Sequence, residues 1–246
     1  MILKLIETFF IGTLASFIGA IAGGGGLISM PFLIFIGLPP QIALATNKFG
    51  GVGLSIGGLI KFIKEKKIVW EYAILLSISG VLGSIIGSNI FLSLSASFLQ
   101  KLIGISLIVL VPTIFFKKDF GINDKDILWK RKVIGSFLYF LVAILASFLG
   151  GMGGITISIV ILFFGLSIVK ASATELFSYS IFSFLSVIIF AFNKIIDYRI
   201  GVVLFLGMML GGYLGAHTAI KKGNKWTKTV FAIVIILSAF KILLNI

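Results

Sequence analysis

The stretch "GAIAGGGGLISMP", residues 19–31, decides the fold of this chain. Four consecutive glycines, Gly23–Gly26, interrupt an apolar segment, and Pro31 follows shortly after them. Each glycine weakens a helix by about 1 kcal/mol relative to alanine, and proline weakens it further. We therefore predict a broken helix here, in surroundings where exposed backbone groups are costly.

Those surroundings are predicted to be a lipid bilayer. Of the 246 residues, 59% are hydrophobic and only 12% are charged. A soluble domain of this length could not cover its surface with so few charges. The apolar residues form long blocks, and several blocks reach the ~20 residues that span a bilayer core. The sequence therefore predicts an all-α polytopic membrane protein.

The apolar blocks fall into two groups of five, separated by the polar stretch "KKDFGINDKDILWKRK". They cover about 5–22, 26–38, 42–63, 71–93 and 98–116, then 133–151, 153–166, 171–192, 199–217 and 227–245. The blocks 26–38 and 153–166 are too short to span at 1.5 Å per residue. We expect a helical bundle with about eight membrane-spanning segments and a broken or re-entrant helix in each half.

The two halves are also related in sequence. An offset of 128 residues pairs Gly25, Gly26, Ala43, Ala45, Thr46, Gly83 and Gly87 with Gly153, Gly154, Ala171, Ala173, Thr174, Gly211 and Gly215. One offset that holds over such a length indicates an internal duplication. We predict a first membrane repeat over 1–116, a charged cytoplasmic linker over 117–132 and a second membrane repeat over 133–246.

Each short block follows a glycine cluster, "AGGGG" in the first half and "GGMGG" in the second. Matching interrupted segments in two halves are a sequence sign of a transporter's binding site. Irregular backbone at membrane depth survives where it is buried in protein or lines a wet cavity. The helix that begins after such a turn directs its positive dipole end to the site, which favours an anion.

Close helix packing is the alternative explanation for membrane glycines. We prefer it for "GVLGSIIGS" at 80–88 and "GMMLGGYLGA" at 207–216. For four glycines in a row followed by a proline, we prefer a binding site.

The formal net charge of +13 arises from basic residues in short loops between apolar blocks. This distribution follows the positive-inside rule and predicts a cytoplasmic linker and no nucleic-acid partner. It does not decide whether the two halves run parallel or inverted. The N-terminal apolar segment resembles a signal peptide, but we expect it to be an uncleaved first membrane segment.

The residues "IAGGGGLISMPFLIFIGLPPQIALATNKFGG", 21–51, resemble the sulfite exporter TauE/SafE family of probable membrane transporter proteins. The match rests on Gly23–Gly26, Pro31, Gly37–Pro40 and Ala45–Lys48. The second half repeats the pattern more loosely, with Thr174 kept and Asn-Lys replaced by Glu175-Leu176. The resemblance implies a multi-pass inner-membrane carrier, often for sulfite, sulfoacetate or related organosulfur anions.

Several polar residues lie where a substrate would bind. Lys48 lies in a long apolar stretch, and a membrane-buried lysine is costly unless it is paired or hydrated. Thr46 and Asn47 can bind an oxyanion or cap a helix. Glu175 could pair with Lys48, couple transport to protons, or lie near the membrane surface. His217 is expected to be an interfacial residue.

No enzyme is predicted. The chain has one histidine and no cysteine, and it lacks a P-loop for ATP. We therefore expect no cofactor, no catalytic residue and no metal site, and transport would be driven by gradients.

The sequence thus predicts a secondary transporter or permease for a small anion, a sulfur oxyanion or organosulfonate, working by alternating access between two repeats. Its substrate-binding residues would be Gly24, Gly25, Gly26, Thr46, Asn47, Lys48, Gly153, Gly154 and Thr174, with Glu175 coupling or gating. The alternatives are a carrier for a cation or metal ion and a non-transporting scaffold subunit, whose glycine turn would be packed dry. Substrate, direction and homo-oligomerisation are left open.

Overall fold

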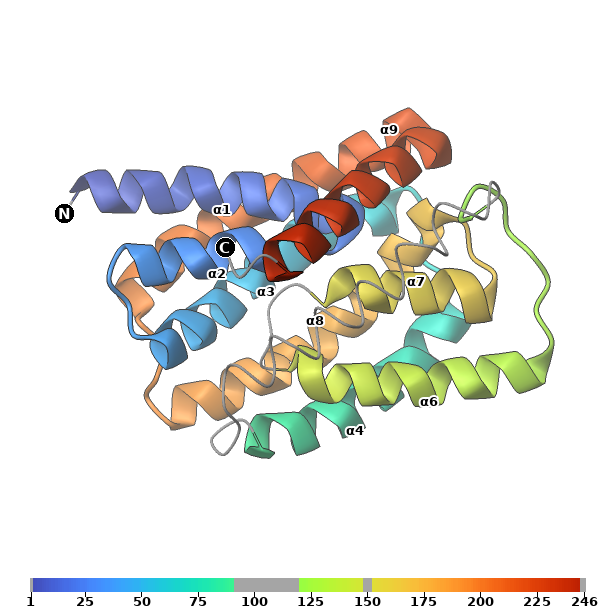
Figure 1. The fold of residues 1–246 in the computed structure, drawn as a ribbon, viewed down its shortest axis with the longest axis horizontal. Helices are drawn as coiled ribbons and strands as arrows, with labels where there is room; N and C mark the ends of the chain where they lie inside the picture. Colours follow the sequence, from blue (N-terminus) through green and yellow to red (C-terminus); the bar gives the residue numbers. More distant parts are fainter. Residues whose placement is uncertain (1, 91–119, 148–151, 244–246) are drawn as a thin grey trace.

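The computed structural model describes residues 2–90, 120–147 and 152–243. Every regular element in this part of the chain is an α-helix (Figure 1). The helices are α1 (Ile2–Ala22), α2 (Gly26–Phe35), α3 (Pro40–Lys64), α4 (Trp70–Ile90), α6 (Trp129–Ala146), α7 (Gly153–Phe164), α8 (Ile168–Phe192) and α9 (Tyr198–Leu243).

Four of the described helices are long and apolar enough to cross a membrane, where we expected about eight spans. They cover Ile2–Ala22, Trp70–Ser88, Ile168–Phe192 and Tyr198–Val234. α3 and α6 are more polar, and α2 and α7 are short apolar helices. The predicted block 98–116 lies outside the described residues. The all-helical membrane architecture is confirmed at this coarser level.

Two helix boundaries differ from the prediction. α6 begins at Trp129, inside the segment that we assigned to the polar linker, because its first turn carries the basic residues of "WKRK". α9 joins the two predicted blocks 199–217 and 227–245 and changes direction between them at Gly223, whose φ is 77° and ψ is −177°. Only glycine adopts this conformation readily, so α9 consists of two helical arms that fold back on each other (Figure 1).

The short helix α2 runs back toward the start of α1. Gly23 has a φ of +71° and reverses the chain after α1. At the far end of α2, the Lys4 Nζ donates a hydrogen bond to the Ile36 carbonyl at 2.9 Å. The 10 residues of α2 rise about 15 Å, half of a bilayer core. α2 is therefore about half the length that a membrane-spanning helix needs.

The segment α6–α9 runs in the opposite direction to α1–α4. The Lys132 Nζ at the start of α6 donates to the Tyr72 hydroxyl at the start of α4, at 2.7 Å. α1 begins at the other end of the molecule (Figure 1). We call the end that holds residues 65–69, 120–128, 165–167 and 223–226 the linker end. The end with residues 36–39 and 193–197 is the opposite end.

The glycines of α4 and α9 bring helices into direct backbone contact. A methyl group on Gly87 would lie 2.0 Å from the Ile144 carbonyl oxygen of α6. A methyl on Gly211 would lie 2.0 Å from the Thr13 carbonyl oxygen of α1. The close-packing interpretation of these two glycine-rich segments is confirmed. α4 thus packs on α6, and α9 packs on α1.

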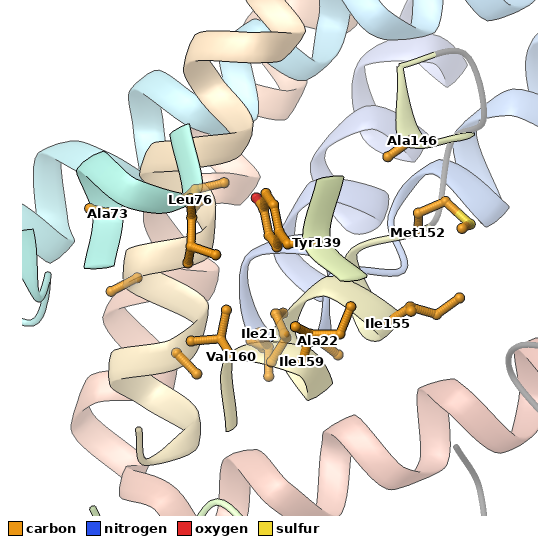
Figure 2. Close-up of a cluster of buried hydrophobic side chains, with 14 of the residues drawn as sticks. Ile21, Ala22, Ala73, Leu76, Tyr139, Ala146, Met152, Ile155, Ile159 and Val160 are labelled. Carbon is orange, nitrogen blue, oxygen red and sulfur yellow. The ribbon is translucent and has the colours of Figure 1, made fainter. Parts of the chain in front are cut away.

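A core of buried apolar side chains surrounds the ends of α1 and α6 (Figure 2). It joins α1, α4, α6, α7 and α8 through Ile21, Leu76, Tyr139, Ile155 and Phe182, all at most 5% exposed. Apolar burial stabilises by about 25 cal/mol per Å². This core fixes the two glycine turns against each other.

Candidate functional site

The two glycine clusters meet at the centre of the molecule. A methyl on Gly23 would lie 2.3 Å from the Gly153 carbonyl carbon, and a methyl on Gly153 would lie 2.4 Å from the Gly23 carbonyl oxygen. Gly25 is equally confined, because a methyl group added to Gly25 would lie 2.4 Å from the Ala15 carbonyl oxygen. Any larger residue at these positions would force the two turns apart.

A cavity of about 60 Å³ opens beside this contact. By the same measure a water molecule needs 10–15 Å³, so the cavity has room for several waters or one small ion. Its lining includes Gly23, Gly25, Gly26 and Gly153 together with the polar side chains of Ser16, Asn47, Thr156, Glu175 and Tyr179. The glycine turns therefore border a cavity whose mainly apolar wall carries five polar side chains.

Two buried hydrogen bonds connect the short helices to the long helices that follow them. The Ser29 hydroxyl of α2 donates to the Asn47 Oδ1 of α3 at 2.6 Å. The Thr156 hydroxyl of α7 donates to the Glu175 Oε1 of α8 at 2.7 Å. Glu175 is 5% exposed, so it lies inside the protein and not at the surface.

Lys48 is buried beside the cavity. Its side chain is 2% exposed, and its Nζ donates to the Ala146 carbonyl at the end of α6. The Nζ also lies 5.1 Å from the ring centre of Tyr179 and 6.0 Å from that of Phe182. A cation is favoured both at a helix C-terminus and over an aromatic face. Ala146 and Tyr179 line the cavity, so the Lys48 Nζ contacts two of its lining residues, although Lys48 itself is not one of them.

Lys48 and Glu175 influence each other electrostatically without direct contact. Within the described residues, the ion pairs are Lys61–Glu65 and Lys170–Asp124. The direct pair between Lys48 and Glu175, which was one alternative from the sequence, is not formed here. Each group instead has its own partner, the Ala146 carbonyl for Lys48 and the Thr156 hydroxyl for Glu175.

Thr46 and Thr174 lie outside the lining of the cavity. The Asp197 backbone N–H donates to the Thr46 hydroxyl at 3.0 Å, and the Val69 N–H donates to the Thr174 hydroxyl at 3.1 Å. Each threonine of one half therefore holds the segment that leads into the fourth helix of the other half. Their predicted role as ligands stays a prediction.

The remaining predicted glycines differ in their surroundings. Gly25, Gly26 and Gly153 line the cavity, whereas a methyl on Gly24 would meet the Val234 side chain at 2.7 Å. Gly154 is buried at the start of α7. His217 is half-buried and does not line the cavity.

The sequence analysis missed Ser16, Thr156 and Tyr179 as lining residues. Thr156 and Tyr179 carry a local signal, because one closely follows the second glycine cluster and the other lies one helical turn after Glu175. Ser16 reaches the cavity only through the packing of α1. Within the described residues, no group of three histidines or acids is placed to hold a metal ion.

Comparison with known proteins agrees with this architecture. The sulfite exporter TauE/SafE family matches residues 8–242. A probable membrane transporter protein of Haemophilus influenzae is 27% identical over 233 residues, covering 94% of this chain and 90% of the relative. The probable membrane transporter protein YfcA of Escherichia coli K12 is 26% identical over 240 residues, covering 96% and 88%.

A more distant relative is the probable membrane transporter protein YunE of Bacillus subtilis, 22% identical over 257 aligned positions that cover 92% of this chain and 93% of the relative. No solved structure matches the chain. The family match covers nearly the whole chain, and four described helices qualify as membrane spans. This chain is an integral membrane protein and belongs to the sulfite exporter TauE/SafE family of membrane transporters.

Proposed function

We propose that this protein carries a small anion by secondary transport and binds it in the cavity beside Gly23 and Gly153. The observation that carries the proposal is the buried Lys48 side chain, whose Nζ contacts Ala146 and Tyr179, two residues that line the cavity. A buried cation in a membrane protein is costly and marks a site of function. The family description points to sulfite, so we propose a sulfur oxyanion or an organosulfonate as substrate.

Two helix ends add to the positive potential of the cavity. α2 begins at Gly26 and α7 begins at Gly153, and both residues line the cavity. The N-terminus of a helix carries a partial positive charge and favours an anion. Asn47 and Thr156 supply polar atoms that could orient oxygen atoms of the substrate. Glu175 is the acidic group beside them and would gate or couple transport.

We further propose that the two halves are an inverted duplication. The residues of the two threonine contacts are related by the same offset of 128, since Thr46 and Val69 correspond to Thr174 and Asp197. Lys66 and Lys194 are related by this offset too, and both have a positive φ, 53° and 55°. Two inverted halves with a binding site between them are typical of alternating access, in which one half rocks against the other.

We place the protein in the inner membrane, with the linker end facing the cytoplasm. Among the described residues, the basic side chains near this end are Lys61, Lys64, Lys66, Lys67, Lys125, Lys130, Arg131, Lys132, Lys170, Lys221, Lys222, Lys225 and Lys228. Near the opposite end they are Lys4, Lys194 and Arg199. The positive-inside rule places the richer end in the cytoplasm.

A scaffold subunit without transport activity would be expected to pack its glycine turns dry. The cavity beside Gly23, with its five polar side chains, favours transport over this alternative. A metal-ion carrier has no support from the described residues, where acids and histidines do not cluster.

Uptake into proteoliposomes tests the proposal. Sulfite, thiosulfate, sulfoacetate, taurine and sulfate would each be offered to vesicles that contain the purified protein, with chloride as the control anion. We expect selective uptake of one sulfur anion, and we expect Lys48→Ala to abolish it. Lys170→Ala is the matched control, because it removes a lysine at the surface. Absence of uptake for every anion, or full activity in Lys48→Ala, would refute the proposal.

A further inference from the structure

A row of polar side chains follows one face of α8 away from the cavity. Glu175, Tyr179, Ser183 and Ser186 are spaced by four, four and three residues, which puts them on one face of a helix. From Glu175 to Ser186 the helix rises about 16 Å. α8 runs from the linker end toward the opposite end, so the row leads from the cavity toward the opposite end.

Two hydroxyl groups beside this row are buried without a partner. The Tyr139 hydroxyl of α6 and the Ser183 hydroxyl have no hydrogen-bond partner among the described residues, and both side chains are 0% exposed. A buried polar group left unpaired costs about 1–3 kcal/mol, and buried hydroxyls are normally satisfied by protein or by ordered water. Two such groups together indicate a place where water binds.

The aromatic contacts place Tyr139 on this row. The Tyr139 ring packs edge-on against Phe182 with ring centres 6.5 Å apart, and Tyr179 packs against the same ring at 5.3 Å. The Tyr139 hydroxyl points toward Leu76 of α4 (Figure 2). Tyr139 thus packs beside the row from α6, against Phe182, the residue before Ser183.

The row continues toward the opposite end through α4. The Ser88 hydroxyl donates to the Ser186 hydroxyl at 3.2 Å, and Ser186 donates to the Phe182 carbonyl at 3.2 Å. Ser88 lies in the last turn of α4, which ends at Ile90. The chain of hydroxyl groups therefore reaches the last turn of α4 and a point six residues before the end of α8.

We propose that this hydroxyl row, formed by Tyr139, Tyr179, Ser183, Ser186 and Ser88, holds a file of water molecules that conducts protons between the opposite end and Glu175. The inference rests on the proposed function and names the coupling ion as the proton. A hydroxyl group can accept a hydrogen bond from one water and donate to the next, as a proton relay requires.

The proton balance of the relay is simple. A hydronium ion at the opposite end passes a proton to the first water, each water passes one on, and the last water protonates the Glu175 carboxylate. One O–H bond forms at Glu175 while one breaks in the last water, and the file is restored by rotation of its waters. The groups that face Glu175 are Lys48 from α3, Thr156 from α7, Tyr139 from α6 and Tyr179 from α8.

Hydration of the row can be tested without any substrate, because the natural chain contains no cysteine. Ser183→Cys in proteoliposomes would be treated with methyl methanethiosulfonate and followed by intact mass. The matched control is Ser158→Cys, since Ser158 is also 0% exposed but donates its hydroxyl to the Gly154 carbonyl at 2.8 Å. Reaction of thiols requires ionisation in water, so we expect Ser183→Cys to react at least about tenfold faster. Equal rates would refute a water-filled row.

Proton conduction is tested by comparing two modes of transport. Tyr139→Phe and Ser183→Ala should leave sulfite–sulfite exchange within about twofold of the wild type, because exchange moves no net proton. They should slow uptake driven by a pH gradient, and the accompanying change of entrapped pyranine fluorescence, by at least about fivefold. Each hydroxyl lost interrupts a relay that needs continuous hydrogen bonds.

The control is Tyr213→Phe, which removes an exposed phenol of α9. Unchanged uptake under a pH gradient in Tyr139→Phe and Ser183→Ala would refute proton conduction through the row. A wild-type protein that exchanges no sulfur anion would instead refute the proposed function, and the cysteine reactivities would still decide whether the row holds water.

Discussion

Gly23 and Gly153 touch backbone to backbone although 130 residues separate them in the sequence. The contact brings the turn after α1 against the start of α7, and the cavity with Asn47 and Glu175 lies beside it. The glycine run that interrupts the first apolar segment thus creates a meeting point between the two halves. Stability and function should both depend on this contact.

Gly23→Ala should therefore destabilise the protein by at least about 2 kcal/mol, because it adds left-handed backbone strain to a steric clash. The φ of Gly23 is +71°, and the added methyl would lie 2.3 Å from Gly153. Thermal unfolding in detergent measures the change. Gly37→Ala is the control, since Gly37 has a φ of +104° and open space around its Cα. If both variants unfold at the same temperature, the contact with Gly153 carries no stability.

Thr46→Val and Thr174→Val should each lower stability by about 1 kcal/mol, because each leaves a backbone N–H of the other half without its acceptor. Thr46→Ser and Thr174→Ser keep the hydroxyl group and should restore the stability. Since neither hydroxyl lines the cavity, anion affinity should stay within about twofold. A large loss of anion affinity with unchanged stability would instead make these threonines ligands, as the sequence suggested.

The broken helices and the residues around them were predictable from local sequence. Glycine runs followed by short apolar blocks gave the positions of α2 and α7, since the conformational freedom of glycine is a property of the residue itself. The candidates Asn47 and Glu175 were found because polar groups in apolar segments are costly. Both line the cavity.

Contacts between the halves were not predictable in the same way. The roles of Thr46 and Thr174 depend on backbone groups more than 100 residues away. Lys48 was recognised as buried, yet its contact with the Ala146 carbonyl depends on how α6 ends beside α3. The direction of the second half was also open, because basic loops fit either arrangement and only the packing of α6 beside α4 distinguishes them.

Asp124 should make the linker end sensitive to acid. Burial alone would raise the pKa of Asp124, but hydrogen bonds from Lys170 and Ser167 hold the pKa below its usual value. A lowered pKa contributes stability that is present above the unfolded-state value near 3.9 and is lost as the pH falls through the folded-state value. Because the pair is largely exposed, the contribution is at most about 1 kcal/mol.

Asp124→Asn should accordingly lower the unfolding temperature slightly at pH 6 and lower it less near pH 3, measured as a melting curve at each pH. Asp126→Asn serves as control, because it removes one charge from the same segment and keeps the contacts of Asp124. Equal losses for Asp124→Asn at pH 6 and pH 3 would contradict the assignment.

The inverted arrangement predicts where two loops are exposed. Lys66 and Lys194 are both exposed with nearly the same backbone conformation, so Lys66→Cys and Lys194→Cys are a matched pair in a chain without cysteine. A membrane-impermeant maleimide added to intact cells should label Lys194→Cys and leave Lys66→Cys unlabelled until the cells are opened. Labelling of both from outside would contradict opposite locations for these two loops.

The most direct measurement is anion-dependent stabilisation of the purified protein in detergent. A ligand that binds only the folded form raises stability by about 2.7 kcal/mol at a hundredfold excess over its Kd. Sulfite, sulfate, thiosulfate, sulfoacetate and taurine would be compared with chloride, in the wild type, in Lys48→Met and in Lys170→Met. We predict that one sulfur anion stabilises the wild type and Lys170→Met but not Lys48→Met. Stabilisation of Lys48→Met to the same degree, or stabilisation of the wild type by a cation alone, would contradict an anion site at the two glycine turns.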